Sequence, residues 1–419
     1  MPLRIKNAIV SIMLLMTATV TSGHAATFSM QRGLNMDIWV TWPDETRWGQ
    51  IDVILPWPEW RRTIDQQALA GLREAGFDTL RIPFDPAVFL SSRTASLHDR
   101  LYASMLETVR EINGAGLKAI VDLHLVPRGD TGLGMEAVLG DPKRFADYLE
   151  IVRRTAQTIA GEDPAMVALE LMNEPGTECD PAGVAQWSGL QRQLFAAARA
   201  SAPRLTIVLT GGCGGSAEGL VALDPGLIPD DNVMWSFHSY RPFLLTHQGA
   251  QWAGDFIRYV TGLTYPPHEM SDSARDAALA AIRERIRAEA PWTRRAGMLA
   301  YLDEQYAEVG TAQSLRNVIE EPFRMVADWA KRHGIAPGNI VLGEFGIIRQ
   351  EWENPTIMPA ASRAAYTRDI IELAERYGYP WAMWGHSGAF GVVDAFNGQR
   401  AEPDVLDVVR ALPPAGLRP

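Results

Sequence analysis

Short apolar runs recur along this chain, and segments with the apolar spacing of helices separate them. Runs of this length form buried strands, and strands that alternate with helices are typical of a parallel sheet. The predicted strands are residues 32–39, 77–84, 117–124, 168–175, 205–210, 233–238, 340–346 and 380–384. Eight such repeats predict a closed (β/α)8 barrel, the TIM-barrel fold of the α/β class.

An open, doubly wound parallel sheet would show the same alternation. No glycine-rich phosphate loop follows the first predicted strand, although such a loop is typical of doubly wound nucleotide-binding folds. Polar residues instead stand repeatedly at the carboxyl ends of the strands, where barrel enzymes assemble their active sites. We therefore favour the barrel over the open sheet.

The interval between the sixth and seventh predicted strands is far longer than one helix needs. About a hundred residues separate His238 from Ile340. Helical spacing is found over residues 274–290 and 314–333, and the second segment is the helix expected before strand seven. The remainder, about residues 241–310, is interpreted as an insertion in the loop after strand six. We expect it to border the cleft and to form no domain of its own.

The first residues have the pattern of a signal peptide. Arg4 and Lys6 precede an apolar run over residues 8–20, and small residues follow at 23–25. The run is too short to span a bilayer, although a retained anchor stays an alternative. We therefore predict removal of residues 1–25, a single domain over residues 26–419, and a location outside the cytoplasm, either secreted or periplasmic.

Composition restricts the partners of the chain. A chain of 419 residues with 47% hydrophobic and 21% charged residues can bury a large core. The formal net charge of −11 and the lack of a basic stripe argue against a nucleic-acid partner. We also expect no stable membrane insertion after signal removal, and a monomer.

The only cysteines are Cys179 and Cys213, too few and wrongly spaced for a zinc site. They follow strands four and five and lie on the same face of the predicted barrel, so we expect a disulfide in an oxidising compartment. Such a bridge would close a loop of about 34 residues, worth roughly 3–4 kcal/mol on chain-entropy grounds.

Two predicted strands end in a glutamate. Residues 168–175 end with Asn173 and Glu174 before a proline, and residues 340–346 place Glu344 between two glycines. An ionisable group at the end of a buried strand is costly to bury unless it has a chemical role. Hydrolysis of a glycosidic bond requires two such carboxylates, one to protonate the leaving oxygen and one to attack or to activate water.

The motifs around these glutamates resemble glycoside hydrolase family 5, the cellulase family within the clan of (β/α)8 retaining glycosidases. The positions that carry the resemblance, besides 171–175 and 343–346, are Arg81, His124, His238, Tyr240 and Trp384. It extends from Arg32 to about Trp384 and implies a retaining double displacement on a β-linked glycan. By this resemblance Glu174 is the general acid and later the base, and Glu344 is the nucleophile that forms the glycosyl-enzyme.

Several polar residues are candidates to support the two glutamates. A nucleophile must stay ionised, so it needs cationic or donating neighbours, for which Arg81 and the Tyr240 hydroxyl are the candidates. Asn173 can donate a hydrogen bond to the sugar 2-hydroxyl, a contact that strengthens in the transition state. His124 and His238 are expected to line the site and to hydrogen-bond sugar hydroxyls or the acid.

Aromatic residues are candidates for sugar contact, because the apolar faces of sugars stack on indoles. Trp384 is expected to be the floor under the cleaved sugar, with His386 as a weaker contact. The loop after the first strand is rich in tryptophan, and core packing could absorb two or three of these residues. Their number favours a loop that presents flat faces to a ligand, so Trp39 is also predicted to contact substrate. The tryptophans in and after strand one are Trp39, Trp42, Trp48, Trp57 and Trp60.

A cellulase-like endo-β-glucanase is the preferred function. Mannan, mixed-linkage glucan and bacterial exopolysaccharide stay compatible substrates, because the long insertion shapes one wall of the cleft. A metal-dependent hydrolase is an alternative suggested by Asp122 and His124, but the first strand has no His-x-His pair. We therefore predict no metal and no cofactor. A noncatalytic glycan-binding barrel is a remote alternative, which release of reducing ends would rule out.

Overall fold

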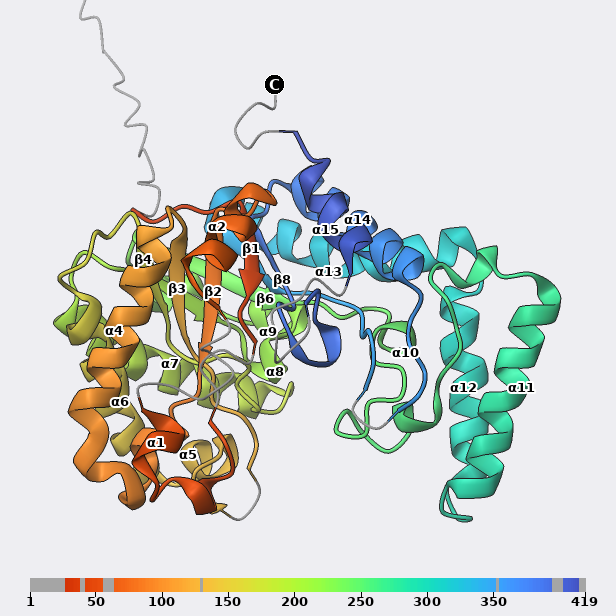
Figure 1. The fold of residues 1–419 in the computed structure, drawn as a ribbon, viewed down its shortest axis with the longest axis horizontal. Coiled ribbons are helices and arrows are strands. Elements are labelled where there is room, and N and C mark those ends of the chain that lie inside the picture. The colour runs from red at the N-terminus through yellow and green to blue at the C-terminus, as the bar shows by residue number, and fades with distance from the viewer. Residues whose placement is uncertain are drawn as a thin grey trace, which may run out of the picture.

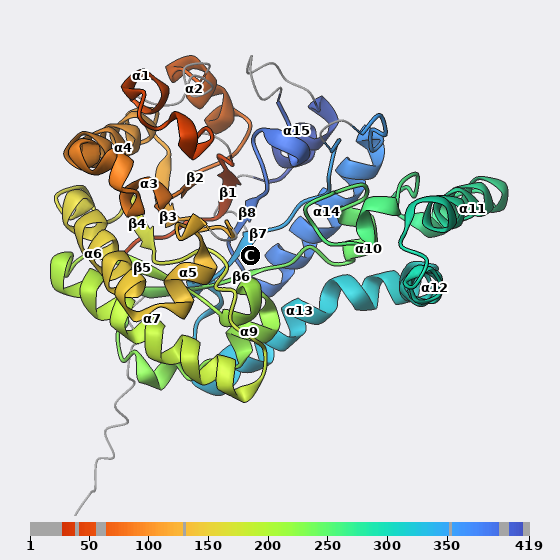
Figure 2. The same cartoon turned by 90° about the horizontal axis from the view of Figure 1, so that it is seen from below.

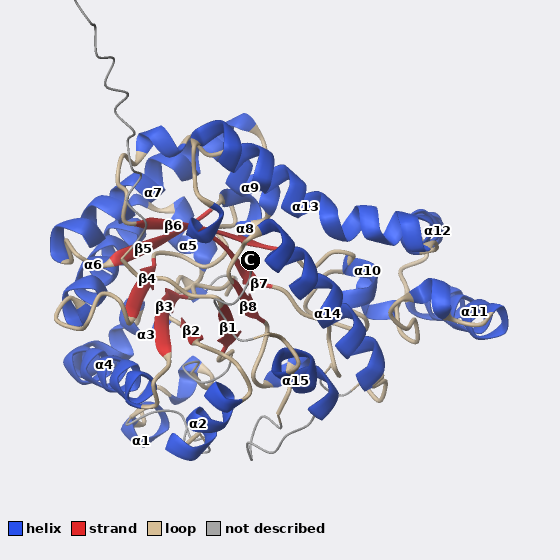
Figure 3. Cartoon of the chain, turned by 90° about the horizontal axis from the view of Figure 1, so that it is seen from above, coloured by secondary structure: helices blue, strands red, loops and turns tan. Residues whose placement is uncertain are grey.

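The computed structural model describes residues 27–37, 42–55, 64–128, 131–351, 354–393 and 402–413. Within this part of the chain the strands close into a parallel barrel in sequence order, and β8 pairs with β1 (Figure 3). The barrel prediction is confirmed, and the open-sheet alternative is excluded. The strands are β1 Arg32–Asn35, β2 Thr79–Phe84, β3 Lys118–Leu123, β4 Val167–Glu170, β5 Thr206–Thr210, β6 Val233–His238, β7 Ile340–Glu344 and β8 Trp381–Met383.

Long helices surround the barrel, as the view along its axis shows (Figure 2). Shorter helices lie in the loops that follow the strands. The long helices are α2 Gln66–Glu74, α4 His98–Gly114, α6 Pro142–Ile159, α7 Pro181–Ser201, α13 Ala312–His333, α14 Ala360–Tyr377 and α15 Pro403–Arg410. The short ones are α1 Ile51–Ile54, α3 Ala87–Leu90, α5 Met135–Gly140, α8 Gly212–Gly215, α9 Ala217–Val221 and α10 Phe243–Thr246.

Aspartate–proline pairs begin two of the outer helices. Asp141 accepts hydrogen bonds from backbone N–H groups in the first turn of α6, and Asp180 does so in α7. A proline follows each aspartate, where its missing N–H has no cost. The second of these helices, α7, therefore begins at Pro181, directly after its cap.

Both faces of the strands are buried, which explains why their sequences are continuous apolar runs rather than alternating ones. One layer fills the space between the strands and the outer helices. A second layer fills the barrel interior and is closed at its amino end by residues before β1. This inner layer consists of Phe28, Met30, Ile120, Ala168, Val208, Met234, Val341 and Ala382.

Two tryptophans after β1 pack into the protein. Trp48 is fully buried and Trp42 is nearly so. The indole N–H of Trp42 donates to the carbonyl of Asp85 at 2.8 Å, and that of Trp48 donates to the carbonyl of Pro43 at 2.7 Å. The expectation that the whole loop presents flat faces to a ligand is therefore corrected for these two. The other tryptophans of the set, Trp39, Trp57 and Trp60, lie outside the described residues, as do residues 1–25.

The insertion after β6 contains two long helices, α11 Asp272–Glu289 and α12 Arg295–Val309. They form an antiparallel hairpin to one side of the barrel, beyond α10 and next to the start of α13 (Figure 1). Apolar residues on the inner faces of both helices are buried, among them Ile282 and Leu302. In the described part of the chain, no helix has the length and apolar content to cross a bilayer.

A disulfide joins the loops that follow two neighbouring strands. Cys179 lies after β4 and Cys213 lies in α8, directly after β5, with Cα atoms 5.1 Å apart. The separation lies within the range that disulfides occupy. The bridge thus fixes two loops at the carboxyl ends of the strands relative to one another.

Candidate active site

A cavity of about 900 Å³ opens at the carboxyl ends of the strands. Most of the predicted site residues line it: His124, Asn173, Glu174, His238, Tyr240, Glu344 and Trp384. Because these residues come from different strands and their following loops, closure of the barrel is what brings them together.

Glu344, the last residue of β7, receives hydrogen bonds on both carboxylate oxygens. Arg81 donates from Nη1 to Oε1 at 2.7 Å, and the Tyr240 hydroxyl donates to Oε2 at 2.8 Å. Burial, together with the carboxylates of Glu344 and Glu174, raises the pKa of Tyr240 well above its ordinary value. Tyr240 therefore keeps its proton and acts as a donor. Charge-assisted hydrogen bonds of this kind favour the ionised form of a carboxyl group.

Arg81 is a buried cation surrounded by acids. Its Nε and Nη2 contact both oxygens of Glu170 at 2.7 and 3.0 Å, and Nη2 lies 3.0 Å from Asp122 Oδ2. Burial alone would lower the pKa of Arg81, but the carboxylates of Asp122, Glu170 and Glu344 raise it well above its ordinary value. A buried charge persists only with such partners. Arg81 thus brings a fixed positive charge to the nucleophile candidate.

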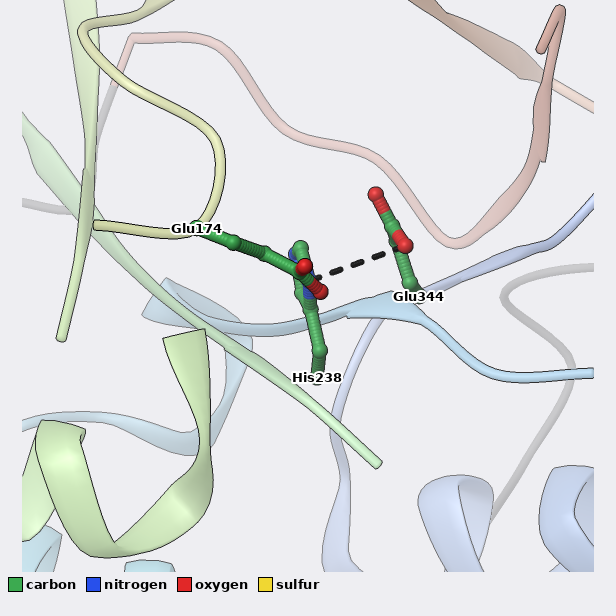
Figure 4. Close-up of side chains that lie close together, drawn as sticks. All are labelled: Glu174, His238 and Glu344. Carbon is green, nitrogen blue, oxygen red and sulfur yellow. Dashed lines mark hydrogen bonds and ion pairs between the residues drawn. The ribbon is translucent and has the colours of Figure 1, made fainter. Parts of the chain in front are cut away.

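Glu174 faces Glu344 across the cavity, with His238 between them (Figure 4). His238 Nδ1 lies 2.7 Å from Glu174 Oε1 and 3.7 Å from Glu344 Oε2. Burial raises the pKa of Glu174, although its side chain is still 37% exposed to the cavity. Burial also lowers the pKa of His238 to about 4. His238 is therefore neutral at pH 7, and its contact with Glu174 fits an Nδ1–H that donates to Oε1 of the carboxyl group.

Glu174 was expected at the end of the fourth strand, but β4 ends at Glu170 and Glu174 lies four residues further, in the loop. Asn173, just before it, has both ends of its amide engaged. Its Oδ1 accepts from Arg81 at 2.7 Å, and its Nδ2 lies 3.3 Å from His124 Nε2. One of the two amide hydrogens of Asn173 is thus still able to reach a sugar hydroxyl.

The rings of His124 and Trp384 stack on one another, and both residues line the cavity. Their ring centres are 5.5 Å apart and the planes are inclined by 20°. His124 Nδ1 lies 2.7 Å from Asp122 Oδ2, and burial lowers the pKa of His124, so the ring is neutral and donates to Asp122. Burial raises the pKa of Asp122 to about 7, against the effect of Arg81. Trp384 is partly exposed, which suits the expected floor under a sugar.

One predicted sugar contact among the described residues, His386, does not line the cavity. The side chain of His386 is buried, and its Nδ1 lies 2.7 Å from the Ser387 hydroxyl, outside the cavity lining. The expectation that His386 contacts a sugar is therefore not supported, because its ring is buried and does not line the cavity. Trp39 lies outside the described residues.

The structure adds residues that the sequence interpretation did not single out. Glu170 holds Arg81 from β4, and Asn35 on β1 accepts from Arg81 Nη1 at 2.9 Å. Asp37 lies beside the site, where burial raises its pKa to about 7. A charged residue within the buried run of residues 167–170 was a usable signal for Glu170, of the same kind that identified Arg81.

The first part of the insertion borders the cavity. Arg241, Phe243, His247 and Trp252 all line it, whereas the helical hairpin of α11 and α12 contributes none of the lining residues. Residues 241–253 therefore form one wall of the cavity.

A family model, Cellulase (glycosyl hydrolase family 5), matches residues 44–389, which is most of the chain. The chain belongs to glycosyl hydrolase family 5. It is therefore a glycoside hydrolase, in agreement with the resemblance drawn from the motifs.

Relatives in this family share low but extensive similarity with the chain. Cellodextrinase A of Ruminococcus flavefaciens is 24% identical over 339 residues, which span 81% of this chain and 90% of the relative. Endoglucanase C of Acetivibrio thermocellus is 22% identical over 325 residues, 77% of this chain and 84% of the relative.

Solved structures share the fold. The cellulose synthase subunit Z of Clostridioides difficile superposes with a TM-score of 0.62 at 19% identity, over 91% of this chain and 99% of that protein. Thermotoga maritima Cel5A in complex with cellobiose superposes with a TM-score of 0.60 at 19% identity, over 91% and 97%.

The central groups of this family 5 hydrolase could also hold a metal ion. Glu174, His238 and Glu344 each offer one ligand atom, and these atoms lie within 4.8 Å of one another. The guanidinium of Arg81, at 2.7 Å from Glu344, would repel a cation bound there. The arrangement therefore suits proton transfer and nucleophilic attack better than metal binding.

Proposed function

We propose that the chain is a retaining endo-β-glucanase that works by double displacement. The observation that supports this most directly is that one carboxylate oxygen of Glu174 lies within 4.8 Å of one carboxylate oxygen of Glu344. Retaining glycosidases have carboxyl groups about 5–5.5 Å apart, whereas inverting enzymes need about 6.5–9.5 Å to admit a water molecule between them. The short separation favours direct attack by a carboxylate.

The unequal surroundings of the two acids support a division of roles. Glu344 accepts from Arg81 and Tyr240, which suits a nucleophile that stays ionised. Glu174 has a raised pKa and a neutral histidine as its partner, which suits an acid that carries a proton at rest. Two carboxyls with different environments are the usual basis for acid and nucleophile assignments.

In the first step, Glu344 attacks the anomeric carbon while Glu174 protonates the departing glycosidic oxygen. The bond to the leaving sugar breaks, and a covalent glycosyl-enzyme forms on Glu344. The Nδ1–H of His238 then stabilises the carboxylate that Glu174 has become. In the second step, Glu174 takes a proton from water, the water oxygen attacks the anomeric carbon, and Glu344 is released.

A β-glucan is the proposed substrate, because the similar proteins include a cellodextrinase and endoglucanases. β-Mannan and a bacterial exopolysaccharide are the alternatives of the same family. We also propose that the mature protein acts outside the cytoplasm, on the basis of the signal-like residues 1–25.

Purified mature protein tested on a panel of β-glucans and mannans, with sizing of the products, would decide between these substrates. We expect reducing ends to appear fastest on a β-glucan, with mid-length products early in the reaction. Release of single disaccharides only would contradict endo action. The absence of reducing ends on every polysaccharide would contradict the proposed function and favour a noncatalytic glycan-binding protein.

A further inference from the structure

The insertion after β6 places exposed aromatic side chains at the cavity that holds the two acids. Trp252 and Phe243 both line this cavity. Trp252 leaves 63% of its surface exposed, and Phe243 leaves 43% exposed. Large apolar side chains that are exposed together beside a cavity mark a ligand-binding surface, unlike single scattered ones.

Trp252 is held in place although it is exposed. Its indole N–H donates to Oε2 of Glu351 at 2.8 Å, and Glu351 is itself buried. The ring of Trp252 meets that of His247 edge to face, with centres 5.5 Å apart and planes inclined by 73°. An indole fixed by these contacts has already lost rotational freedom, so a ligand that stacks on it loses less entropy on binding.

Ring contacts connect Trp252 with the reaction centre. His247 is buried, and its ring stacks on Phe243 at 4.1 Å and meets Tyr240 at 5.0 Å. The hydroxyl of Tyr240 donates to Glu344 at 2.8 Å. An unbroken series of contacts therefore runs from Trp252 to the nucleophile candidate. Trp252 and Glu344 also line the same cavity.

Polar groups stand next to this aromatic surface. Arg241 and Glu218 line the same cavity, and Arg241 forms ion pairs with Glu218 and Glu321 that hold its guanidinium. A flat apolar surface beside fixed hydrogen-bonding groups matches a pyranose, which has apolar C–H faces and a rim of hydroxyl groups. The cavity is also large, at about 900 Å³, compared with the usual range of about 300–1,000 Å³ for small-molecule sites.

We propose that Trp252 and Phe243 form a distal glycan subsite, which stacks a sugar residue of the bound β-linked chain beyond the sugars at the cleaved bond. This inference rests on the proposed glycosidase function and adds a preference for longer chains. The subsite contributes binding only when the substrate is long enough to reach it. Activity should therefore rise with chain length up to the length that fills the subsite.

The test compares Trp252→Ala with wild type on β-linked gluco-oligosaccharides from disaccharide to hexasaccharide, and on an aryl β-glucoside. We expect the loss in kcat/KM to grow with chain length and to reach about tenfold on the longest chain, the size of one lost stacking contact. Trp252→Phe keeps an aromatic face and should recover part of this loss. Phe243→Ala is an independent second variant and should show the same dependence on length.

Trp292→Ala is the matched control. Trp292 lies in the turn between α11 and α12, is 81% exposed and does not line the cavity, so its removal should leave kcat/KM unchanged at every length. Equal losses at all lengths for Trp252→Ala and Phe243→Ala, or no loss on the hexasaccharide, would overturn the subsite while the glycosidase function stands. A wild-type enzyme inactive on every β-linked substrate would overturn the proposed function, and the subsite with it.

Discussion

Replacement of Arg81 by methionine tests how strongly its acidic partners depend on it. Arg81 lies within 3.0 Å of Asp122, Glu170 and Glu344, and each of these side chains is buried. Removal of one partner of a buried ion pair costs about 3–5 kcal/mol, because the remaining charge is left uncompensated. Since all three carboxylates lose the same cation, we expect Arg81→Met to lower the free energy of unfolding by about 5 kcal/mol at neutral pH.

The loss should be smaller in weak acid. Burial already raises the pKa of Asp122 to about 7, although Arg81 acts to lower it. Without Arg81 the pKa of Asp122 rises further, so this group takes up a proton in the folded state at and below neutral pH. A carboxyl whose folded-state pKa lies above its unfolded value destabilises the protein as pH rises. The Arg81→Met variant should therefore regain stability between about pH 7 and pH 5.

The coupling energy between Arg81 and Glu170 can be measured by urea unfolding, followed by circular dichroism. The proteins compared are wild type, Arg81→Met, Glu170→Gln and the double variant. Glutamine removes the charge of Glu170 at nearly constant shape, so it should relieve part of the loss caused by Arg81→Met. We expect a coupling energy of about 0.5–3 kcal/mol between the two sites. Additive losses, or a loss below about 1 kcal/mol for Arg81→Met, the range of a surface pair, would refute this reasoning.

Four further predictions concern the chemistry and the stability of the domain. With an aryl β-glycoside that has an acidic leaving group, Glu174→Ala should form the glycosyl-enzyme and then stall, and azide should release a β-glycosyl azide. Glu344→Ala should form no covalent intermediate, and azide rescue of this variant to a β-product would reverse the two roles. Burial lowers the pKa of His386 to about 4, so stability should fall as pH drops from about 6.5 to about 4, by up to roughly 3 kcal/mol. His386→Asn should remove only the part of this fall that His386 contributes, because the pKa of His238 is lowered in the same way, and thermal unfolding of both proteins across that pH range would detect the difference. Cys213→Ser opens a loop of 34 residues and should cost about 3–4 kcal/mol in urea unfolding, whereas an unchanged midpoint would contradict a stabilising bridge. Chelation with EDTA should leave hydrolysis of the preferred polysaccharide unchanged, and loss of activity that added metal restores would favour the metal-dependent alternative.

Local sequence patterns were sufficient to predict the barrel fold. The apolar runs are buried on both faces, and each predicted run overlaps an observed strand. Polar residues at the ends of these runs or just after them, such as His238, Tyr240 and Glu344, had to lie at the carboxyl edge because all strands of a parallel barrel point the same way. Apolar periodicity and strand direction are properties of short segments. They can therefore be recognised in the sequence without the rest of the fold.

Contacts between distant segments were decided only by the tertiary structure. Glu170 meets Arg81 across 89 residues of sequence, since the register of the strands places Arg81 level with Ala168, two residues before Glu170 on β4. The tertiary structure also decided that the side chain of His386 is buried. It placed residues 241–253 at the wall of the cavity, whereas the rest of the insertion does not line it. A local pattern reports that a residue is buried or polar, but the identity of its neighbours depends on how all eight strands close together.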